Sequence, residues 1–378
     1  MAAFWYEEVV RTVGSRSPSI STQESYGYRS TSECRCHDDR ADAIIRAATY
    51  HNYDYCRSVI WFSPEEHDGI RQSIATPFPR NPDTGLCSFN RLPLELLYEV
   101  LLHLDMETLF HLRQASSGTR RAVDSLMHYQ AVVSHALSAF RALLQTGLAS
   151  SVSLFNFYDV LCTKACVFCG EFDEFVFLLT WKRCCYKCLK DKEETQLVPP
   201  LSVQKEFKLT DAQGAQLKSL KTVPAIDTTK STGNKSRSTL VSREQASIIS
   251  GQPRRSHWNF PQNKRFNLKG ACTLPYYNSR TGQVDRGMLC AGCLLALDNL
   301  GLFGRFSVQW WSKVCDKVYT QNEYLEHFRW CKQAQVLWES SDGGTIKPPD
   351  LPEAAHRQGF FGDSEERKEG CGIFPRKV

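Results

Sequence analysis

The chain has no run of apolar residues long enough to cross a membrane. A spanning helix needs about 18 or more consecutive apolar residues, and the most apolar stretch here, residues 175–181, is far shorter. The first residues also lack the basic start and the apolar run that are typical of a secretory signal. We therefore expect no membrane-spanning segment and a location in the cytoplasm, the nucleus or both.

The common catalytic motifs are missing as well. The sequence contains no phosphate-binding glycine loop, no dinucleotide-binding glycine motif, no HExxH pair and no GxSxG nucleophile motif. No Ser/His/Asp or Cys/His arrangement stands out, and His103, His111, His128 and His135 fall on predicted helices where surface or core positions explain them. The sequence therefore predicts a protein that is not an enzyme and has no catalytic residues.

A strong charge of one sign is also absent. Lys and Arg number 46 against 41 Asp and Glu, a net charge of +5. Residues 201–256 alone hold ten Lys or Arg and four Asp or Glu, a balance of +6, so the basic character is confined to this segment. Its only aromatic residue is Phe207, and such a composition predicts a basic, low-complexity linker. Nucleic acid is accordingly not an expected partner.

What the chain does contain is enough apolar sequence for a core, with 42% hydrophobic residues. A length of 378 residues allows about two to three compact units. Residues 1–87 show little pattern, and we expect them to be poorly ordered. The Gly- and Pro-rich residues 339–378 are expected to form a mobile tail.

Residues 89–127 predict three short helices. Pro93 suits a helix start, Asp105 is a candidate cap for a second helix over 106–115, and 116–118 form a turn before a third helix over 119–126. The first helix is apolar on more than one face, so one face is expected to pack within the chain and the other to meet a partner. Alternatively, the amphipathic segment 131–148 covers the second face, and the periodicity leaves both interpretations open.

The first of these helices resembles the start of an F-box. The segment 92–104 reads LPLELLYEVLLHL and matches the family pattern at Leu92, Pro93, Glu95, Leu96, Val100, Leu101 and Leu104. Many family members carry a Trp in the third helix, and here it is missing. The match covers about a tenth of the chain. An F-box followed by cysteine-rich modules is similar to F-box proteins of filamentous fungi.

This resemblance implies a partner. An F-box docks on the small adaptor subunit of an SCF-type cullin-RING ubiquitin ligase and carries no catalysis of its own. The residues that the resemblance assigns to adaptor binding are Leu92, Pro93, Leu96, Leu97, Val100, Leu101 and Leu104.

Sixteen cysteines in a chain without a secretion signal favour metal over disulfides. Cys166 and Cys169 form one Cys-x2-Cys pair, and Cys185 and Cys188 form another after 15 intervening residues. Two such pairs supply the four soft ligands of a tetrahedral zinc site. Gly170 follows the first pair, where a residue free to adopt a positive φ helps the chain to turn.

A second set begins with Cys290 and Cys293, after a hairpin predicted around residues 278–282. Thr320 and Glu323 form a capping-box match that opens a helix. His327 and Cys331 lie four residues apart, so on one helix they share a face and can share a metal. An ordinary, partly buried histidine is the competing interpretation of His327.

Both sets offer four protein ligands and no open position, so we expect two structural Zn²⁺ ions. Four other cysteines lie near enough in sequence to substitute as ligands: Cys162, Cys184, Cys272 and Cys315. Cys34, Cys36, His37 and Cys56 fit no ligand spacing, and we interpret these cysteines as free thiols.

The sequence as a whole predicts an α+β, multi-module chain. The expected modules are a poorly ordered segment (1–87), an F-box (88–128), helices with the first zinc module (129–200), a linker (201–256), a second zinc module (257–338) and a tail (339–378). The leading hypothesis is a substrate-recruiting F-box subunit that binds the adaptor through the F-box and an unknown protein through the zinc-stabilised part, as a monomer within the ligase. One alternative is a zinc-dependent nucleic-acid-binding protein, in which aromatic residues stack on bases, such as Trp258, Phe260, Trp310 and Trp311. The other alternative is an F-box scaffold that acts outside ubiquitin ligases.

Overall fold

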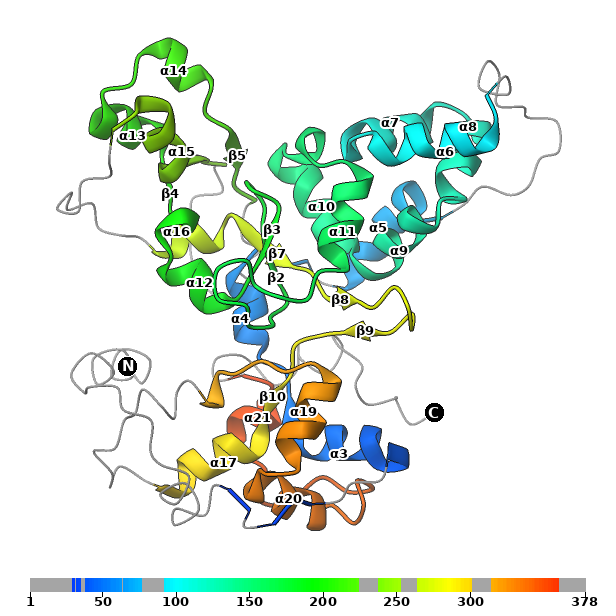
Figure 1. Cartoon of the computed structure of the whole chain (residues 1–378), viewed down its shortest axis with the longest axis vertical. Helices are drawn as coiled ribbons and strands as arrows, with labels where there is room; N and C mark the ends of the chain where they lie inside the picture. The colour runs from blue at the N-terminus through cyan, green and yellow to red at the C-terminus, as the bar shows by residue number, and fades with distance from the viewer. Residues whose placement is uncertain are drawn as a thin grey trace. The chain divides into compact units, whose positions relative to one another are not determined.

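The computed structural model describes residues 29–30, 32–34, 38–62, 64–76, 92–223, 237–252, 264–300 and 314–359 (Figure 1). The chain divides into two compact units. Unit 1 combines residues 1–54 with 287–378, and unit 2 spans residues 55–286. Within the described residues, no helix has the length and apolar character needed to span a bilayer.

Unit 2 contains the helices predicted around residues 89–127. Helix α6 begins after Pro93, Asp105 caps α7 by accepting a hydrogen bond from the Thr108 amide at 2.8 Å, and Ser116 forms a capping box at the start of α8. The second helix has the predicted bounds, whereas the third begins and ends two residues earlier than predicted. The three helices are α6 (Leu94–His103), α7 (Met106–Ala115) and α8 (Ser117–Asp124), and α5 (Pro64–Ile74) precedes them in the chain.

The predicted helix over 131–148 is in fact two helices, α9 (Met127–His135) and α10 (Leu137–Thr146), separated at Ala136. Gly147, in the left-handed conformation at φ 76°, ends α10. A 3-10 turn (Ala149–Ser151) then leads into α11 (Leu154–Leu161). Buried residues of these helices join one core with those of α6–α8, so the three F-box helices are not a separate module.

A three-stranded antiparallel sheet adjoins these helices, in the order β3-β2-β7. Strands β2 and β3 form a hairpin, and Trp181 adopts φ 50° in the turn between them. Helix α12 (Tyr186–Asp191) follows the hairpin. The strands are β2 (Phe175–Phe177), β3 (Lys182–Cys184) and β7 (Ala271–Thr273). Their buried side chains extend the helical core into the sheet.

The expectation of a linker over 201–256 is wrong for the described residues of that segment. They form helices and strands around a small core of Val203, Phe207, Val241 and Ala246. Glu206 is buried and pairs with Arg243, so charge is matched within the segment. The elements are the 3-10 turn Glu193–Thr195, β4 (Leu197–Val198), α13 (Pro200–Phe207), α14 (Asp211–Ala215), β5 (Ser219–Lys221), β6 (Thr239–Ser242) and α15 (Arg243–Ser250). The strands pair in the order β4-β6-β5.

Unit 2 ends with α16 (Lys264–Leu268) and the predicted hairpin, which pairs β8 (Tyr276–Tyr277) with β9 (Val284–Asp285). Gly282 sits in its turn with φ 71°. Residues 257–286 therefore belong to unit 2 and not to a second module that begins at 257.

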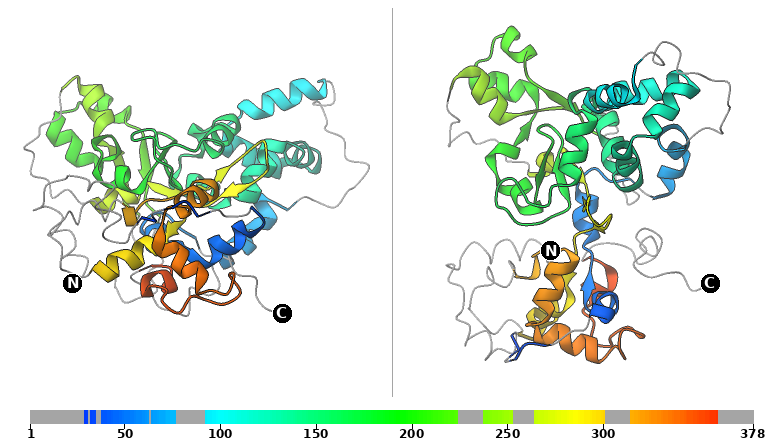
Figure 2. Two further views of the ribbon diagram at one scale, coloured as in Figure 1. Left: turned by 60° about the horizontal axis from the view of Figure 1, so that its bottom comes forward. Right: turned by 45° about the vertical axis from the view of Figure 1, so that its right-hand side comes forward.

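Unit 1 is assembled from two distant parts of the chain. Strand β1 (Thr49–Tyr50) pairs with β10 (Leu289–Cys290). Helix α3 (Ala41–Ala48) contacts α19 (Gln321–Phe328) and α20 (Lys332–Glu339), and Figure 2 shows the blue N-terminal segment beside the orange C-terminal helices. The remaining elements are the 3-10 turn Asp38–Arg40, α17 (Ala291–Leu300) and α21 (Glu353–Arg357), while α4 (Tyr53–Ser58) contains the boundary between the units.

Two expectations are therefore corrected in unit 1. Residues 38–50 are not poorly ordered, because Ile44, Ile45 and Ala48 bury their side chains in the core of this unit. The tail expected from 339 onward contains α21, and Ala355 is buried in the same core. Short segments such as these lack an obvious pattern, since the residues that cover them come from the other end of the chain.

Candidate functional sites

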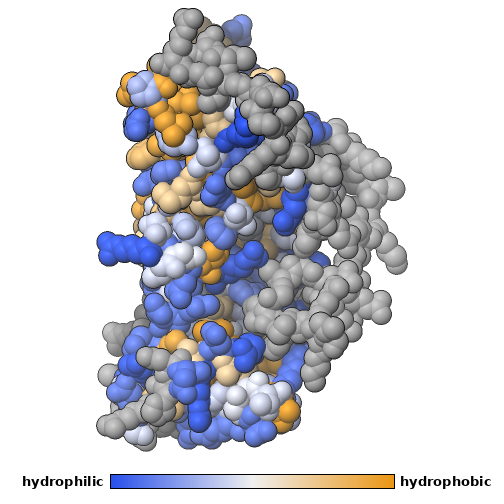
Figure 3. Space-filling model, turned by 90° about the vertical axis from the view of Figure 1, so that its right-hand side faces the viewer, coloured by the Kyte–Doolittle hydropathy of each residue, from blue (hydrophilic) through white to orange (hydrophobic). Residues whose placement is uncertain are grey.

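Helix α6 keeps one of its apolar faces at the surface. Leu96 is 55% exposed and Val100 is 50% exposed, and Leu92 and Pro93 are exposed just before the helix. Residues 96, 100 and 103 are separated by four and three positions, so they lie on one face. Figure 3 shows hydrophobic side chains at the surface in the upper part of the face that it presents.

The other face of α6 packs into the core of unit 2. Leu97 is 3% exposed and Leu101 is 2% exposed, so these two side chains are not available to a partner in this structure, contrary to the sequence prediction. Leu104 is half-buried against the same core. Of the residues predicted to bind the adaptor, four are exposed: Leu92, Pro93, Leu96 and Val100.

The suggestion that residues 131–148 cover the second apolar face of this helix is not what the structure shows. Helix α10 packs its buried residues into the core of unit 2 and contacts α7. Within the part of the chain that is described, the Leu96 and Val100 side chains stay exposed. The face is therefore open to another molecule.

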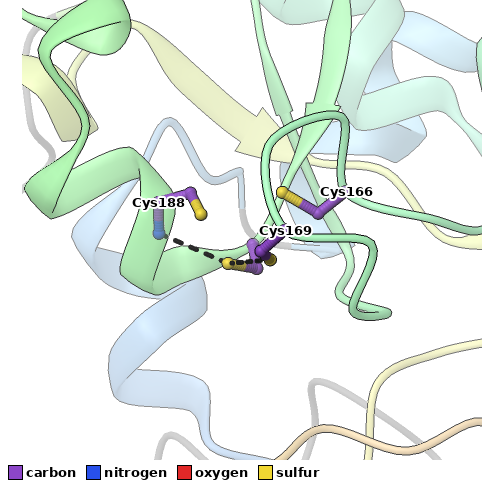
Figure 4. A group of neighbouring side chains, drawn as sticks. Cys166, Cys169 and Cys188 are labelled. Atoms are coloured by element: carbon purple, nitrogen blue, oxygen red, sulfur yellow. Dashed lines mark hydrogen bonds between the residues drawn. The ribbon is translucent and has the colours of Figure 1, made fainter.

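The first cysteine set comes together in unit 2. Cys166, Cys169, Cys185 and Cys188 each offer one sulfur, and the four sulfurs lie within 4.8 Å of one another. Figure 4 shows Cys188 on α12, facing the loop that carries Cys166 and Cys169. The Sγ atoms of Cys169 and Cys185 are 3.6 Å apart.

Local backbone geometry explains how each pair forms. Gly170 donates to the Cys166 carbonyl at 2.9 Å and has φ 76°, as the sequence predicted. At the second pair, Cys185 caps α12, and its Sγ accepts a hydrogen bond from the Cys188 amide at 3.3 Å. An amide that donates to sulfur stabilises the thiolate form that binds metal.

The thiols of this cluster are strongly coupled. A hydrogen bond with the Cys185 thiol lowers the pKa of Cys166 to about 4. The same hydrogen bond and burial raise the pKa of Cys185, and burial raises that of Cys188 to about 12. Without a cation, four such neighbouring sulfurs cannot all carry charge, so a metal ion that binds here displaces protons.

The second set comes together in unit 1. Cys290, Cys293, His327 and Cys331 also place their ligand atoms within 4.8 Å of one another. The Sγ atoms of Cys290 and Cys331 are 3.8 Å apart, and Cys293 Sγ lies 3.2 Å from His327 Nε2. The Cys293 amide donates to Cys290 Sγ at 3.4 Å, which repeats the arrangement of the first site.

The four residues of this second set come from three elements. Cys290 is in β10 and Cys293 is in α17, and His327 lies in the last turn of α19, which ends at Phe328. Cys331 caps α20. His327 and Cys331 therefore do not share one helix as predicted, although the turn that joins the helices still brings them to one place.

Electrostatics at the second site resemble those at the first. Burial alone would raise the pKa of Cys290, but hydrogen bonds with the Cys293 and Cys331 thiols lower it below its ordinary value. The pKa of Cys293 is raised by burial and by its contact with Cys290. The His327 ring stacks on Tyr319 at 4.8 Å between centroids, which fixes its orientation.

Both donor sets fit a tetrahedral zinc ion. Zn–S bonds of about 2.3 Å place two sulfur ligands about 3.8 Å apart, which agrees with the separations of 3.6 Å and 3.8 Å. Four sulfurs, or three sulfurs with one imidazole, are among the ligand sets of structural zinc sites. The donor atoms number four in each group.

The other thiols lie outside these two groups. Cys184 is buried and donates to the Lys182 carbonyl at 3.4 Å, and Cys315 donates to the Cys293 carbonyl at 3.4 Å. Cys272 pairs with Val176 in the sheet of unit 2 and belongs to neither four-residue group. Cys162 is half-buried.

Part of the set Cys34, Cys36, His37 and Cys56 lies outside the described residues, namely Cys36 and His37. Cys56 donates to Glu174 at 3.2 Å. The aromatic residues Trp258, Phe260, Trp310 and Trp311, the candidates for base stacking in the nucleic-acid alternative, also lie outside the described part of the chain.

Sequence reasoning missed the residue that supports the first site. Arg183 is fully buried beside the cluster and donates to the backbone carbonyls of Asp173, Val160, Leu274 and Pro275 at 2.7–3.2 Å. Burial lowers the pKa of Arg183 to about 10. No local pattern marks such a residue, since its partners are up to 92 positions away.

Sequence reasoning also missed the N-terminal contribution to the second site. Thr49 lies opposite Cys290 in the β1–β10 pair. Tyr324 is buried and donates from its hydroxyl to the Ala48 carbonyl at 2.9 Å. The strand and helix that carry the candidate ligands Cys290 and His327 are thus held by residues more than 230 positions earlier in the chain.

Comparison with known proteins defines the class of this chain. A family model described as F-box domain matches residues 89–130. No curated protein and no solved structure matches the chain. The chain therefore contains an F-box domain over residues 89–130, and cysteine-rich groups lie C-terminal to it. F-box domains bind the adaptor subunit of SCF ubiquitin ligases, and F-box proteins are in general non-catalytic substrate receptors.

Proposed function

We propose that this protein is a substrate-recruiting subunit of an SCF-type ubiquitin ligase. The observation that carries this proposal is the division of α6 into two faces. Leu97 and Leu101 hold the helix in the core, while Leu96 and Val100 remain exposed within a matched F-box domain. Neighbouring exposed apolar residues beside a packed face are typical of a protein-protein interface.

In this proposal the adaptor binds Leu92, Pro93, Leu96 and Val100, and the remainder of the chain presents a surface to a target protein. The protein itself performs no chemistry and acts by bringing the target close to the conjugating enzyme. It works as a monomer within the ligase, in the cytoplasm, the nucleus or both.

We further propose that the two cysteine groups hold structural Zn²⁺. The donor atoms, their separations and the amide–sulfur hydrogen bonds support this assignment. Zinc would neutralise the clustered sulfurs and lock the turns that carry them, so that units 1 and 2 each depend on one ion for their stability.

Co-purification with the adaptor tests the ligase proposal. We expect a 1:1 complex with the wild-type chain and none with the Leu96→Asp, Val100→Asp double variant, because two buried carboxylates without partners oppose association. The matched control is Leu201→Asp, Ile248→Asp, which places the same charges on exposed apolar positions of α13 and α15. A folded, metal-loaded wild-type chain that stays alone refutes the proposal.

Metal analysis of the purified chain tests the zinc proposal. We expect about two zinc ions per chain, and one fewer in Cys331→Ser. Cys315→Ser is the control, because Cys315 is buried beside the same site but does not belong to the ligand group. Loss of zinc in Cys315→Ser, and not in Cys331→Ser, would overturn the ligand assignment.

A further inference from the structure

One exposed aromatic residue of unit 2 lies at the end of the exposed face of α6. Phe155, near the start of α11, is 50% exposed. Its ring lies 6.1 Å from the ring of His103, measured between centroids. His103 is exposed and shares the face of Leu96 and Val100. The surface therefore runs from these apolar residues through His103 to Phe155.

The position of Phe155 is fixed by backbone hydrogen bonds. The Leu154 amide donates to the Leu104 carbonyl at 3.0 Å, and the Met106 amide donates to the Val152 carbonyl at 2.9 Å. These bonds flank an antiparallel bridge between Asp105 and Ser153. The start of α11 is thus paired with the junction between α6 and α7.

The rest of α11 is anchored in the core. Leu154, Phe157 and Leu161 are buried, and the Phe157 ring packs on Trp181 at 4.6 Å between centroids. The Trp181 indole donates to the Asn156 carbonyl at 3.2 Å. Phe155 is presented on a rigid element, so little side-chain and backbone freedom is lost when a partner covers it.

We infer that the adaptor-binding face of this chain extends beyond the F-box onto α11, with Phe155 as an additional anchor for the adaptor subunit. The inference rests on the proposed function. Single exposed apolar residues are common on protein surfaces, and continuity with the F-box face distinguishes Phe155 from the others. Helix α11 lies outside the matched residues 89–130, so the anchor is a feature of this chain and not of the family motif.

The occupant is the adaptor because the adaptor binds the neighbouring face. A partner that covers Leu96, Val100 and His103 reaches Phe155 at the next position along the same surface. Aromatic side chains at such positions often supply a large share of binding energy, since they bury a large apolar area with only two rotatable bonds.

Titration calorimetry with the adaptor tests this inference. We expect Phe155→Asp to raise the dissociation constant at least about tenfold, and Phe155→Leu to stay within about threefold of the wild type because it keeps an apolar side chain. Leu201→Asp is the matched control and should leave the affinity unchanged. Thermal denaturation and zinc content verify that each variant is folded.

Hydrogen exchange on the unmodified chain provides a second test that does not depend on a variant. In the complex, the amides of residues 155–158 should exchange more slowly, together with those of 94–103. An unchanged dissociation constant for a folded Phe155→Asp, or unchanged exchange at 155–158, overturns the extension onto α11. If either of these results is found while the wild-type chain binds the adaptor and the Leu96→Asp, Val100→Asp double variant does not, only the extension onto α11 fails and the F-box proposal stands. Failure of the wild-type chain to bind overturns the proposed function itself.

Discussion

Leu96 and Leu97 are neighbours in α6, and truncating each of them to alanine should affect different properties. Leu97→Ala should lower the stability of unit 2, and Leu96→Ala should lower the affinity for the adaptor. The two side chains are chemically identical and lie on the same helix. The change in helix propensity is therefore the same for both variants and cancels when they are compared. They differ in burial, with Leu97 3% exposed and Leu96 55% exposed. The pair therefore separates stability from binding within a single motif.

The magnitude for Leu97 follows from its place in the core of unit 2. Truncation of a buried leucine costs about 2–5 kcal/mol, because apolar contacts are lost and the cavity collapses only partly. For a domain of this size each kcal/mol lowers the melting temperature by about 2–4 °C. We therefore expect Leu97→Ala to melt about 4–20 °C below the wild type.

Leu96→Ala should change the free energy of unfolding by no more than about 0.5 kcal/mol, as is usual for exposed positions. Its effect should be on adaptor affinity instead, where a loss of about 1–2 kcal/mol corresponds to a dissociation constant about 5- to 30-fold higher. Leu97→Ala should bind with nearly wild-type affinity at temperatures well below its melting point.

Differential scanning calorimetry and titration calorimetry on the same preparations measure both quantities. The reasoning is refuted if Leu96→Ala destabilises unit 2 as much as Leu97→Ala. It is also refuted if a fully folded Leu97→Ala loses more affinity for the adaptor than Leu96→Ala. Either result would mean that the exposed and buried faces of α6 are assigned the wrong way round.

Three further predictions concern the two candidate metal sites and the residues that support them. Cys188→Ser should lose one zinc ion per chain, as measured by mass spectrometry. Cys184→Ser should keep both ions, because Cys184 is buried but lies outside the ligand group. Equal zinc losses in the two variants would contradict the ligand assignment. Arg183→Met should unfold unit 2, because it leaves three buried carbonyls and the half-buried Val160 carbonyl without this donor, at about 1–3 kcal/mol for each buried group. Wild-type thermal stability would rule this out. Tyr324→Phe should lower the unfolding free energy of unit 1 by about 1 kcal/mol in urea, since the buried Ala48 carbonyl loses its donor; no change in the urea midpoint would argue against that support.

Features that depend on neighbours in the chain were predictable from the sequence. The second F-box helix, its Asp105 cap and the Thr320–Glu323 capping box all use contacts within a few residues. The turn at Gly170 and the hairpin at Gly282 likewise follow from residues that tolerate a positive φ. The eight candidate ligands were identified for the same reason, because Cys-x2-Cys pairs are local signals.

Features that depend on long-range burial were not predictable. Periodicity showed two apolar faces on α6, but only the packing of the unit 2 core determined that Leu97 is buried and Val100 exposed. Residues 201–256 looked too polar to fold, yet a few apolar side chains such as Phe207 and Val241 meet across the segment. Burial depends on which surfaces meet in space, and a composition average does not contain that information.

The amino-acid sequence was sufficient to identify the F-box and to group the eight metal-ligand candidates, since short spacings and helix periodicity carry both signals. The tertiary structure was needed to join residues 41–50 to the second cysteine group, where β1 lies against Cys290. It was also needed to place Phe155 at the end of the F-box face. Both arrangements bring together residues that are far apart in the sequence. Which of these residues meet is decided by the cooperative packing of a whole core, and no local sequence pattern contains that information.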